Sequence, residues 1–221
     1  MQITGAIFDM DGTLINSLIL WEVFWSRLGA HYLGDPDFRP EPEEEQTMRT
    51  MTLRGLSDRL HETYGFGENG DELFRTTNEL CERFYIDEVE MKEGALELLE
   101  HMKAKGIKMC IASASAMNLI EIAMKKFDLD RFFPRIFSCA DIGKGKDHPD
   151  VFNVAHEYLG TDKDSTWVFE DSIVAIETSV KAGYKTVGIY DRCGFAHDEM
   201  QRLSDRYVGE GDSLKALIPE I

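Results

Sequence analysis

Phe8-Asp9-Met10-Asp11-Gly12-Thr13-Leu14 is the stretch that decides the fold, and it overlaps the end of the apolar run at 6–8. Two carboxylates one residue apart follow a predicted buried strand and precede a glycine turn. Side chains two positions apart in an extended segment point the same way, so Asp9 and Asp11 would repel each other. Such a pair is favoured where a cation or a reaction needs it. We therefore expect this segment to carry the chemistry of the protein.

Short apolar runs recur along the chain, and most of them end in polar residues. Segments with helical spacing of apolar residues separate these runs, which is typical of a parallel α/β sheet. One such helix is expected to bury Val151, Val154, Ala155 and Tyr158. We expect an α/β fold with a Rossmann-like parallel core whose strands lie at 6–8, 107–112, 136–137, 167–169 and 186–189.

Residues 16–89 break this alternation and contain no convincing strand. Apolar residues at helical spacing instead predict an inserted domain made of helices. We expect residues 1–15 and 90–221 to form the core domain and residues 16–89 to form a helical cap. The expected helical stripes are Leu18, Trp21, Trp25 and Leu28, then Met48, Met51, Leu56 and Leu60, then Leu73, Thr77, Leu80 and Phe84.

The composition excludes several classes of partner. The formal net charge of -17 argues against binding to nucleic acid or to an anionic membrane, because phosphate backbones need Lys and Arg. No signal peptide is expected, and no apolar stretch is long enough to span a membrane. The cysteines form no Cys-x-x-Cys pair, so neither a zinc site nor a disulfide framework is expected. These features favour a cytoplasmic protein, and we expect a monomer or a weak homodimer.

The polar residues that follow the predicted strands should converge, because ligands bind at the carboxyl ends of strands in an open parallel sheet. Two unit charges about 4 Å apart repel by roughly 4 kcal/mol at an effective dielectric of about 20. Several carboxylates in one crevice therefore need either protons or a cation. An all-oxygen ligand set favours Mg²⁺. The residues expected to meet are Asp9, Asp11, Ser113, Glu170 and Asp171.

A site of this kind suits phosphoryl transfer. One carboxylate can attack phosphorus, and a second can protonate the leaving oxygen and later activate water. A lysine is needed to offset the added phosphate charge, and either Lys144 or Lys146 could supply it. Ser113 and the N–H of Ala114 could hold the phosphoryl oxygens.

Four motifs follow one another along the chain. They are Asp9-Met10-Asp11-Gly12-Thr13-Leu14, then Ile111-Ala112-Ser113-Ala114-Ser115, then Gly145-Lys146-Asp147-His148-Pro149-Asp150-Val151-Phe152, and last Phe169-Glu170-Asp171-Ser172. In order and spacing the chain resembles the haloacid dehalogenase superfamily of phosphohydrolases. It is similar to the branch with a helical cap after the first strand, and within it to the β-phosphoglucomutase-like group.

The resemblance implies a role for each matching residue. Asp9 would be the nucleophile and a Mg²⁺ ligand. Asp11 would be the general acid and base, with its backbone carbonyl on the ion. Asp171 would bind Mg²⁺ directly, and Glu170 would bind it directly or through water.

The phosphoryl group would be held by Ser113 and Lys146, with help from the Ala114 N–H, and Lys144 would be peripheral. The implied activity is a Mg²⁺-dependent phosphatase that acts on a small phosphorylated metabolite, such as a sugar phosphate or a nucleotide, through an aspartyl-phosphate. Two alternatives stay open, namely a hexose phosphate mutase and a non-catalytic phosphate-binding protein. We expect Arg49, Arg54 and Arg59 to be solvated rather than to bind substrate.

Overall fold

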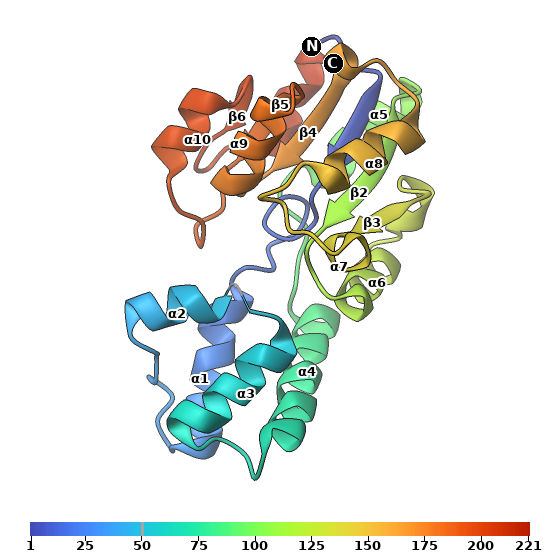
Figure 1. Ribbon diagram of the computed structural model, residues 1–221. Helices are drawn as coiled ribbons and strands as arrows, with labels where there is room; N and C mark the ends of the chain where they lie inside the picture. The colour runs from blue at the N-terminus through green and yellow to red at the C-terminus, as the bar shows by residue number, and fades with distance from the viewer. Residues whose placement is uncertain (50) are drawn as a thin grey trace. The chain divides into compact units, whose positions relative to one another are not determined.

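The computed structural model describes residues 1–49 and 51–221 and divides into two compact units. One unit, Met1–Leu18 with Val89–Ile221, contains the sheet. The other unit, Ile19–Glu88, consists of helices and their connections. Figure 1 shows both units.

Within the described residues, six parallel strands form one sheet in the order β3-β2-β1-β4-β5-β6. The expected Rossmann-like α/β fold is confirmed. β6 was not predicted, because it has three residues and begins with a charged arginine. The strands are β1 (Gly5–Phe8), β2 (Lys108–Ser113), β3 (Ile136–Ser138), β4 (Thr166–Glu170), β5 (Lys185–Ile189) and β6 (Arg206–Val208).

Helices connect successive strands and cover the sheet (Figure 1). Right-handed crossovers place α5 and α6 on one face and α8, α9 and α10 on the other. Short 3₁₀ turns lie at Leu129–Arg131, Lys163–Ser165 and Leu214–Glu220. The helices of this unit are α5 (Ala95–Ala104), α6 (Met117–Lys126), α7 (Cys139–Ile142), α8 (Asp150–Leu159), α9 (Ile173–Lys181) and α10 (His197–Leu203).

The buried face of α8 differs from the expected one. Val154 and Tyr158 are 42% and 47% exposed, so their predicted burial is wrong. Phe152 and Leu159 are buried instead, beside Val151 and Ala155. The apolar positions are dense enough to suit two neighbouring helix faces, and the face with Phe152 and Leu159 packs into the core.

The strand order creates a switch point between β1 and β4. The chain leaves β1 toward β2 on one side, whereas β4 continues toward β5 on the other. Such a switch point is where an open α/β sheet binds its ligands. The rings of Phe8 and Phe169 stack here with centroids 4.2 Å apart, and both are buried. The Asp9 N–H donates to the carbonyl of Phe169 at 3.0 Å, which fixes the ends of the two strands side by side.

Among the described residues, the helical unit contains four helices, one more than the sequence predicts. The predicted helix through Met48 and Leu60 is wrong, because the segment forms two helices, α2 and α3. Thr52 is extended and its hydroxyl accepts the Gly55 N–H at 3.1 Å, so a new helix starts there. The helices are α1 (Leu20–Tyr32), α2 (Pro42–Arg49), α3 (Leu53–Tyr64) and α4 (Gly70–Asp87).

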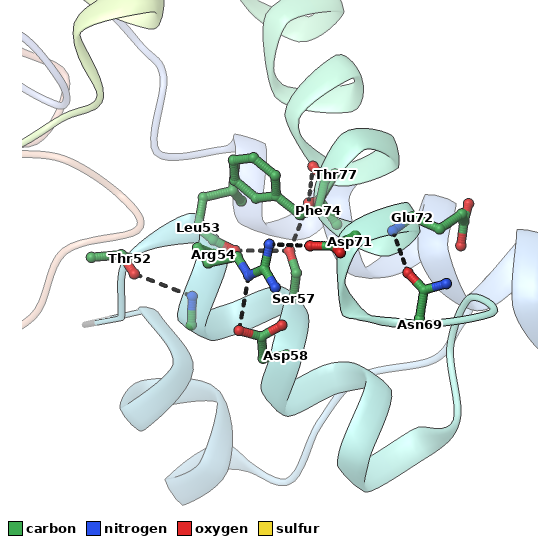
Figure 2. Close-up of polar contacts among 11 residues, drawn as sticks. Thr52, Leu53, Arg54, Ser57, Asp58, Asn69, Asp71, Glu72, Phe74 and Thr77 are labelled. Atoms are coloured by element: carbon green, nitrogen blue, oxygen red, sulfur yellow. Dashed lines mark hydrogen bonds and ion pairs between the residues drawn. The ribbon is translucent and has the colours of Figure 1, made fainter.

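Two kinds of polar contact join α3 to α4 (Figure 2). The hydroxyls of Ser57 and Thr77 lie 2.9 Å apart and are buried. Arg54 bonds Asp58 at 3.0 Å and Asp71 at 2.5 Å, but its side chain is half exposed. Burial makes the hydroxyl pair the stronger determinant of how these two helices pack.

These contacts yield a prediction about stability. Thr77→Val keeps the side-chain shape but removes a buried hydrogen bond, so it should lower the free energy of unfolding by about 1 kcal/mol. Arg54→Met should lower it less, because water screens the ion pairs of Arg54. Urea denaturation of the two variants checks this order. A larger loss for Arg54→Met would contradict it.

Candidate active site

Three carboxylates meet at the switch point. Asp9 follows β1, Glu170 ends β4, and Asp171 is the next residue. All three are buried, and one oxygen of each lies within 4.8 Å of the others. The paired ends of β1 and β4 account for this grouping, because Phe8 and Phe169 are partners in the sheet.

Lys146 lies among these carboxylates and is largely shielded from solvent, with a side chain 10% exposed. Its ammonium donates to Glu170 Oε1 at 2.5 Å and also to Asp9 Oδ1. The loop after α7 carries this lysine from a distant part of the sequence to the sheet edge. Lys144, two residues earlier, instead pairs with Asp150 at 2.8 Å and is half exposed. Of the two candidate lysines, Lys146 therefore contacts the carboxylates of the site, whereas Lys144 pairs elsewhere.

The site remains strongly acidic despite Lys146. Burial raises the pKa of Asp9 to about 7, with Lys146 acting against this and Glu170 and Asp11 adding to it. Burial and then the charges of Asp9 and Glu170 hold the pKa of Asp171 well above its usual value. For Lys146, burial favours the neutral amine, but Asp9 and Glu170 outweigh it and raise the pKa. Because folding raises both pKa values, ionisation of Asp9 and Asp171 costs more in the folded protein than in the unfolded chain. The two groups therefore lower the stability of the folded protein as the pH rises above their unfolded-state pKa near 4.

Two hydroxyls hold the carboxylate of Asp11. Ser17 Oγ donates to Asp11 Oδ1 at 2.6 Å, and Ser115 Oγ donates to Asp11 Oδ2. Ser17 comes from the segment after β1 and Ser115 from the loop after β2. Asp11 is not part of the three-carboxylate group, so the paired aspartates of the sequence motif have different surroundings.

The Gly-Thr pair of the first motif packs against Asp171. Thr13 Oγ1 donates to Asp171 Oδ1 at 3.1 Å. Gly12 has φ +83°, and a Cβ there would lie 2.4 Å from Asp171 Oδ2. Only glycine meets both the backbone requirement and the close approach. The motif thus positions an acidic residue that lies far away in the sequence.

Ser113 ends β2 at the same sheet edge, and Ala114 follows it. Ser113 is fully buried, and its hydroxyl accepts the Ser115 N–H at 3.1 Å. Ala114 is exposed. The Ser113 hydroxyl thereby orders the loop whose next member, Ser115, holds Asp11.

The donor set fits a divalent cation. Asp9, Glu170 and Asp171 supply three carboxylates in one buried group, and the ammonium of Lys146 contacts two of them. The excess negative charge is costly in a buried setting unless it is neutralised. Oxygen ligands without histidine or cysteine favour a hard ion such as Mg²⁺ over zinc.

Sequence reasoning missed the residues that support the site. Ser17 follows the first motif and Ser115 ends the second, but nothing in the local sequence shows that either side chain holds Asp11. A search for hydroxyl residues near the ends of predicted strands could have found them.

Three arginines of the helical unit each have carboxylate partners within that unit, namely Glu45 for Arg49, Asp58 and Asp71 for Arg54, and Glu44 for Arg59.

Within the part of the chain that the structure describes, no helix combines the length and the apolar character that crossing a membrane requires.

Comparison with known proteins places these features in a family. Residues 6–189 match the model of the family described as haloacid dehalogenase-like hydrolase. Pyrophosphatase PpaX of Bacillus mycoides is 26% identical over 191 residues, which is 86% of this chain and 84% of that protein. Pyrophosphatase PpaX of Bacillus cereus (strain B4264) is 27% identical over 192 residues, with the same coverage of both chains.

Solved structures show the same fold. CbbY from Rhodobacter sphaeroides in complex with phosphate superposes with a TM-score of 0.73 at 21% identity, covering 93% of each chain. A Thermotoga maritima protein provisionally classed as a β-phosphoglucomutase gives 0.81 at 20% identity, covering 99% of this chain and 100% of that one. The family model spans the sheet unit from β1 to β5, and the resemblance read from the four motifs is confirmed. This chain belongs to the haloacid dehalogenase-like hydrolases.

Proposed function

We propose that this hydrolase is a Mg²⁺-dependent phosphatase that acts on a small phosphorylated metabolite through an aspartyl-phosphate at Asp9. The observation that carries the proposal is the position of Lys146, whose ammonium contacts both Asp9 and Glu170 beside Asp171. This arrangement brings a nucleophile, a cation site and a fixed positive charge together in a buried setting.

In the first half of the reaction, a carboxylate oxygen of Asp9 bonds to phosphorus while the bond from phosphorus to the leaving oxygen breaks. Asp11 gives its proton to that oxygen. The contacts from Ser17 and Ser115 orient the Asp11 carboxyl for this transfer. Lys146, Ser113 and the Ala114 N–H bind the phosphoryl oxygens.

In the second half, the Asp11 carboxylate takes a proton from water, and the water oxygen attacks the phosphorus. The acyl-phosphate bond breaks, phosphate leaves, and both aspartates regain their starting forms. When bound by Asp9, the Asp11 carbonyl, Glu170 and Asp171, Mg²⁺ would offset charge on the transferring phosphoryl group.

The substrate is proposed from the site and from the named relatives. Sugar phosphates and nucleotides fit a site for one phosphoryl group. The pyrophosphatases, alike over most of the chain, favour inorganic pyrophosphate as a second candidate, with phosphate as the leaving group. CbbY is described with phosphate and, as a mutant, with xylulose-(1,5)bisphosphate, which is consistent with a phosphorylated small molecule.

The nucleophile is tested by Asp9→Asn. The amide cannot attack phosphorus, so phosphate release should fall by at least about a thousandfold, which corresponds to about 4 kcal/mol. Phosphate release from p-nitrophenyl phosphate and from the best natural substrate measures the effect. Asp164→Asn, an exposed change just before β4, is the control and should keep full activity. Unchanged turnover by Asp9→Asn would contradict the assignment.

A substrate panel separates the candidate functions. Inorganic pyrophosphate, sugar phosphates and nucleoside monophosphates are supplied with Mg²⁺ and, separately, with EDTA. Hexose 1-phosphate with a hexose bisphosphate is included. We expect Mg²⁺-dependent release of phosphate. Isomerised sugar phosphate without free phosphate would identify a mutase, and phosphate binding without turnover of any compound would identify a non-catalytic protein.

The cation site is tested by Asp171→Asn. The change removes one of the crowded negative charges but keeps an oxygen for Thr13, so the metal-free variant should melt at a higher temperature than the metal-free parent protein. Mg²⁺ should stabilise the parent protein and should stabilise the variant much less. Thermal melting with and without Mg²⁺ measures both effects. Equal stabilisation of the two proteins would contradict the proposed ligand set.

A further inference from the structure

A second lysine, Lys92, is largely shielded from solvent at the same end of the sheet as the acidic site and takes no part in the reaction described above. The Lys92 ammonium donates to Asp191 Oδ2 at 2.9 Å and to the carbonyl of Tyr190 at 3.0 Å. The side chains of Lys92 and Asp191 are 13% and 6% exposed. The pair joins the segment that leads into α5 to the end of β5, across 99 positions of sequence.

This ion pair lies at the same edge of the sheet as the three carboxylates. β4 and β5 are adjacent and parallel, with Glu170 opposite Gly188. Asp171 follows β4, and Asp191 follows β5 by two positions. The turn from Asp191 reaches Asp171 directly, because a Cβ at Gly194 would lie 3.9 Å from the Asp171 carbonyl oxygen.

The carboxylate of Asp191 also shapes this turn. Its Oδ1 accepts the Cys193 N–H at 2.9 Å, and its backbone carbonyl accepts the Gly194 N–H at 2.9 Å. The Lys92 N–H donates to the carbonyl of Leu14, the last residue of the first motif, at 2.9 Å. The pair therefore links three segments of the sheet edge, and both of its charges are held in place.

The charge of Asp191 acts on the proposed cation ligands. After burial and the charges of Asp9 and Glu170, the charge of Asp191 makes a smaller contribution to the raised pKa of Asp171. Lys92 offsets this charge, so the two side chains together contribute little electrostatic potential at the site. Removing either partner would leave one buried charge of known sign near the site, where the effective dielectric is lower than in water.

We propose that Lys92 and Asp191 are positioning residues that balance charge beside the acidic site and thereby set its affinity for the divalent cation. The inference rests on the proposed function, in which Asp9, Glu170 and Asp171 hold that cation. Neither Lys92 nor Asp191 belongs to the ligand group formed by the described residues.

Opposite effects of the two single variants test the inference. Lys92→Met leaves Asp191 uncompensated, so the Kd for Mg²⁺ should fall by at least about threefold. Asp191→Asn leaves Lys92 uncompensated, so the Kd should rise by at least about threefold. The double variant should return to within about twofold of the parent value, and Lys92→Arg should keep it.

Calorimetric titration of metal-free protein with Mg²⁺ gives these constants without an activity assay. Circular dichroism confirms that each variant is folded, and if Lys92→Met does not fold, Asp191→Asn and the double variant decide. Lys185→Met is the matched control, because it removes the same charge from the opposite end of β5 and should leave the Kd unchanged.

Two results would overturn the inference. One is a shift of the Kd in the same direction in both single variants, which a purely structural role would give. The other is an unchanged Kd in folded Asp191→Asn. Failure of the parent protein to bind Mg²⁺ would instead contradict the proposed function itself, and the inference with it.

Discussion

The buried excess of negative charge between β1 and β4 is the constraint on which the rest of the structure depends. Asp9, Glu170 and Asp171 are held within 4.8 Å of one another, and Lys146 offsets only part of their charge. This repulsion lowers the stability of the metal-free protein, yet the surrounding contacts keep the three carboxylates together. The fold therefore maintains a local arrangement that favours a bound cation and, with it, an anionic phosphoryl group.

The fold creates this arrangement through backbone pairing more than through side-chain contacts. Parallel pairing of β1 with β4 brings their last residues side by side, and the buried rings of Phe8 and Phe169, one residue before Asp9 and Glu170, stack on each other. Gly12 then lets the chain turn against Asp171. A rigid apolar layer thus supports a polar site that could not hold itself together.

Much of this could be predicted from the sequence, because strand ends in a parallel sheet converge whatever the details of packing. That rule alone predicts that Asp9, Glu170 and Asp171 lie at one edge of the sheet. The supporting contacts could not be predicted, since Ser115 and Asp11 lie 104 positions apart and neither has a local pattern that indicates the other. The packed face of α8 and the division between α2 and α3 were mispredicted for a related reason. Apolar spacing did not distinguish neighbouring helix faces, and it did not register the cap formed by Thr52.

The central claim is that Asp9 becomes phosphorylated during turnover, and chemical trapping tests it most directly. The enzyme is quenched during steady-state turnover and treated with borohydride, which reduces an acyl phosphate to an alcohol. Mass spectrometry of the peptide that spans Asp9 should then find homoserine at this position, and only when substrate was present. Full turnover with an unmodified Asp9, or with the label at another carboxylate, would contradict the account.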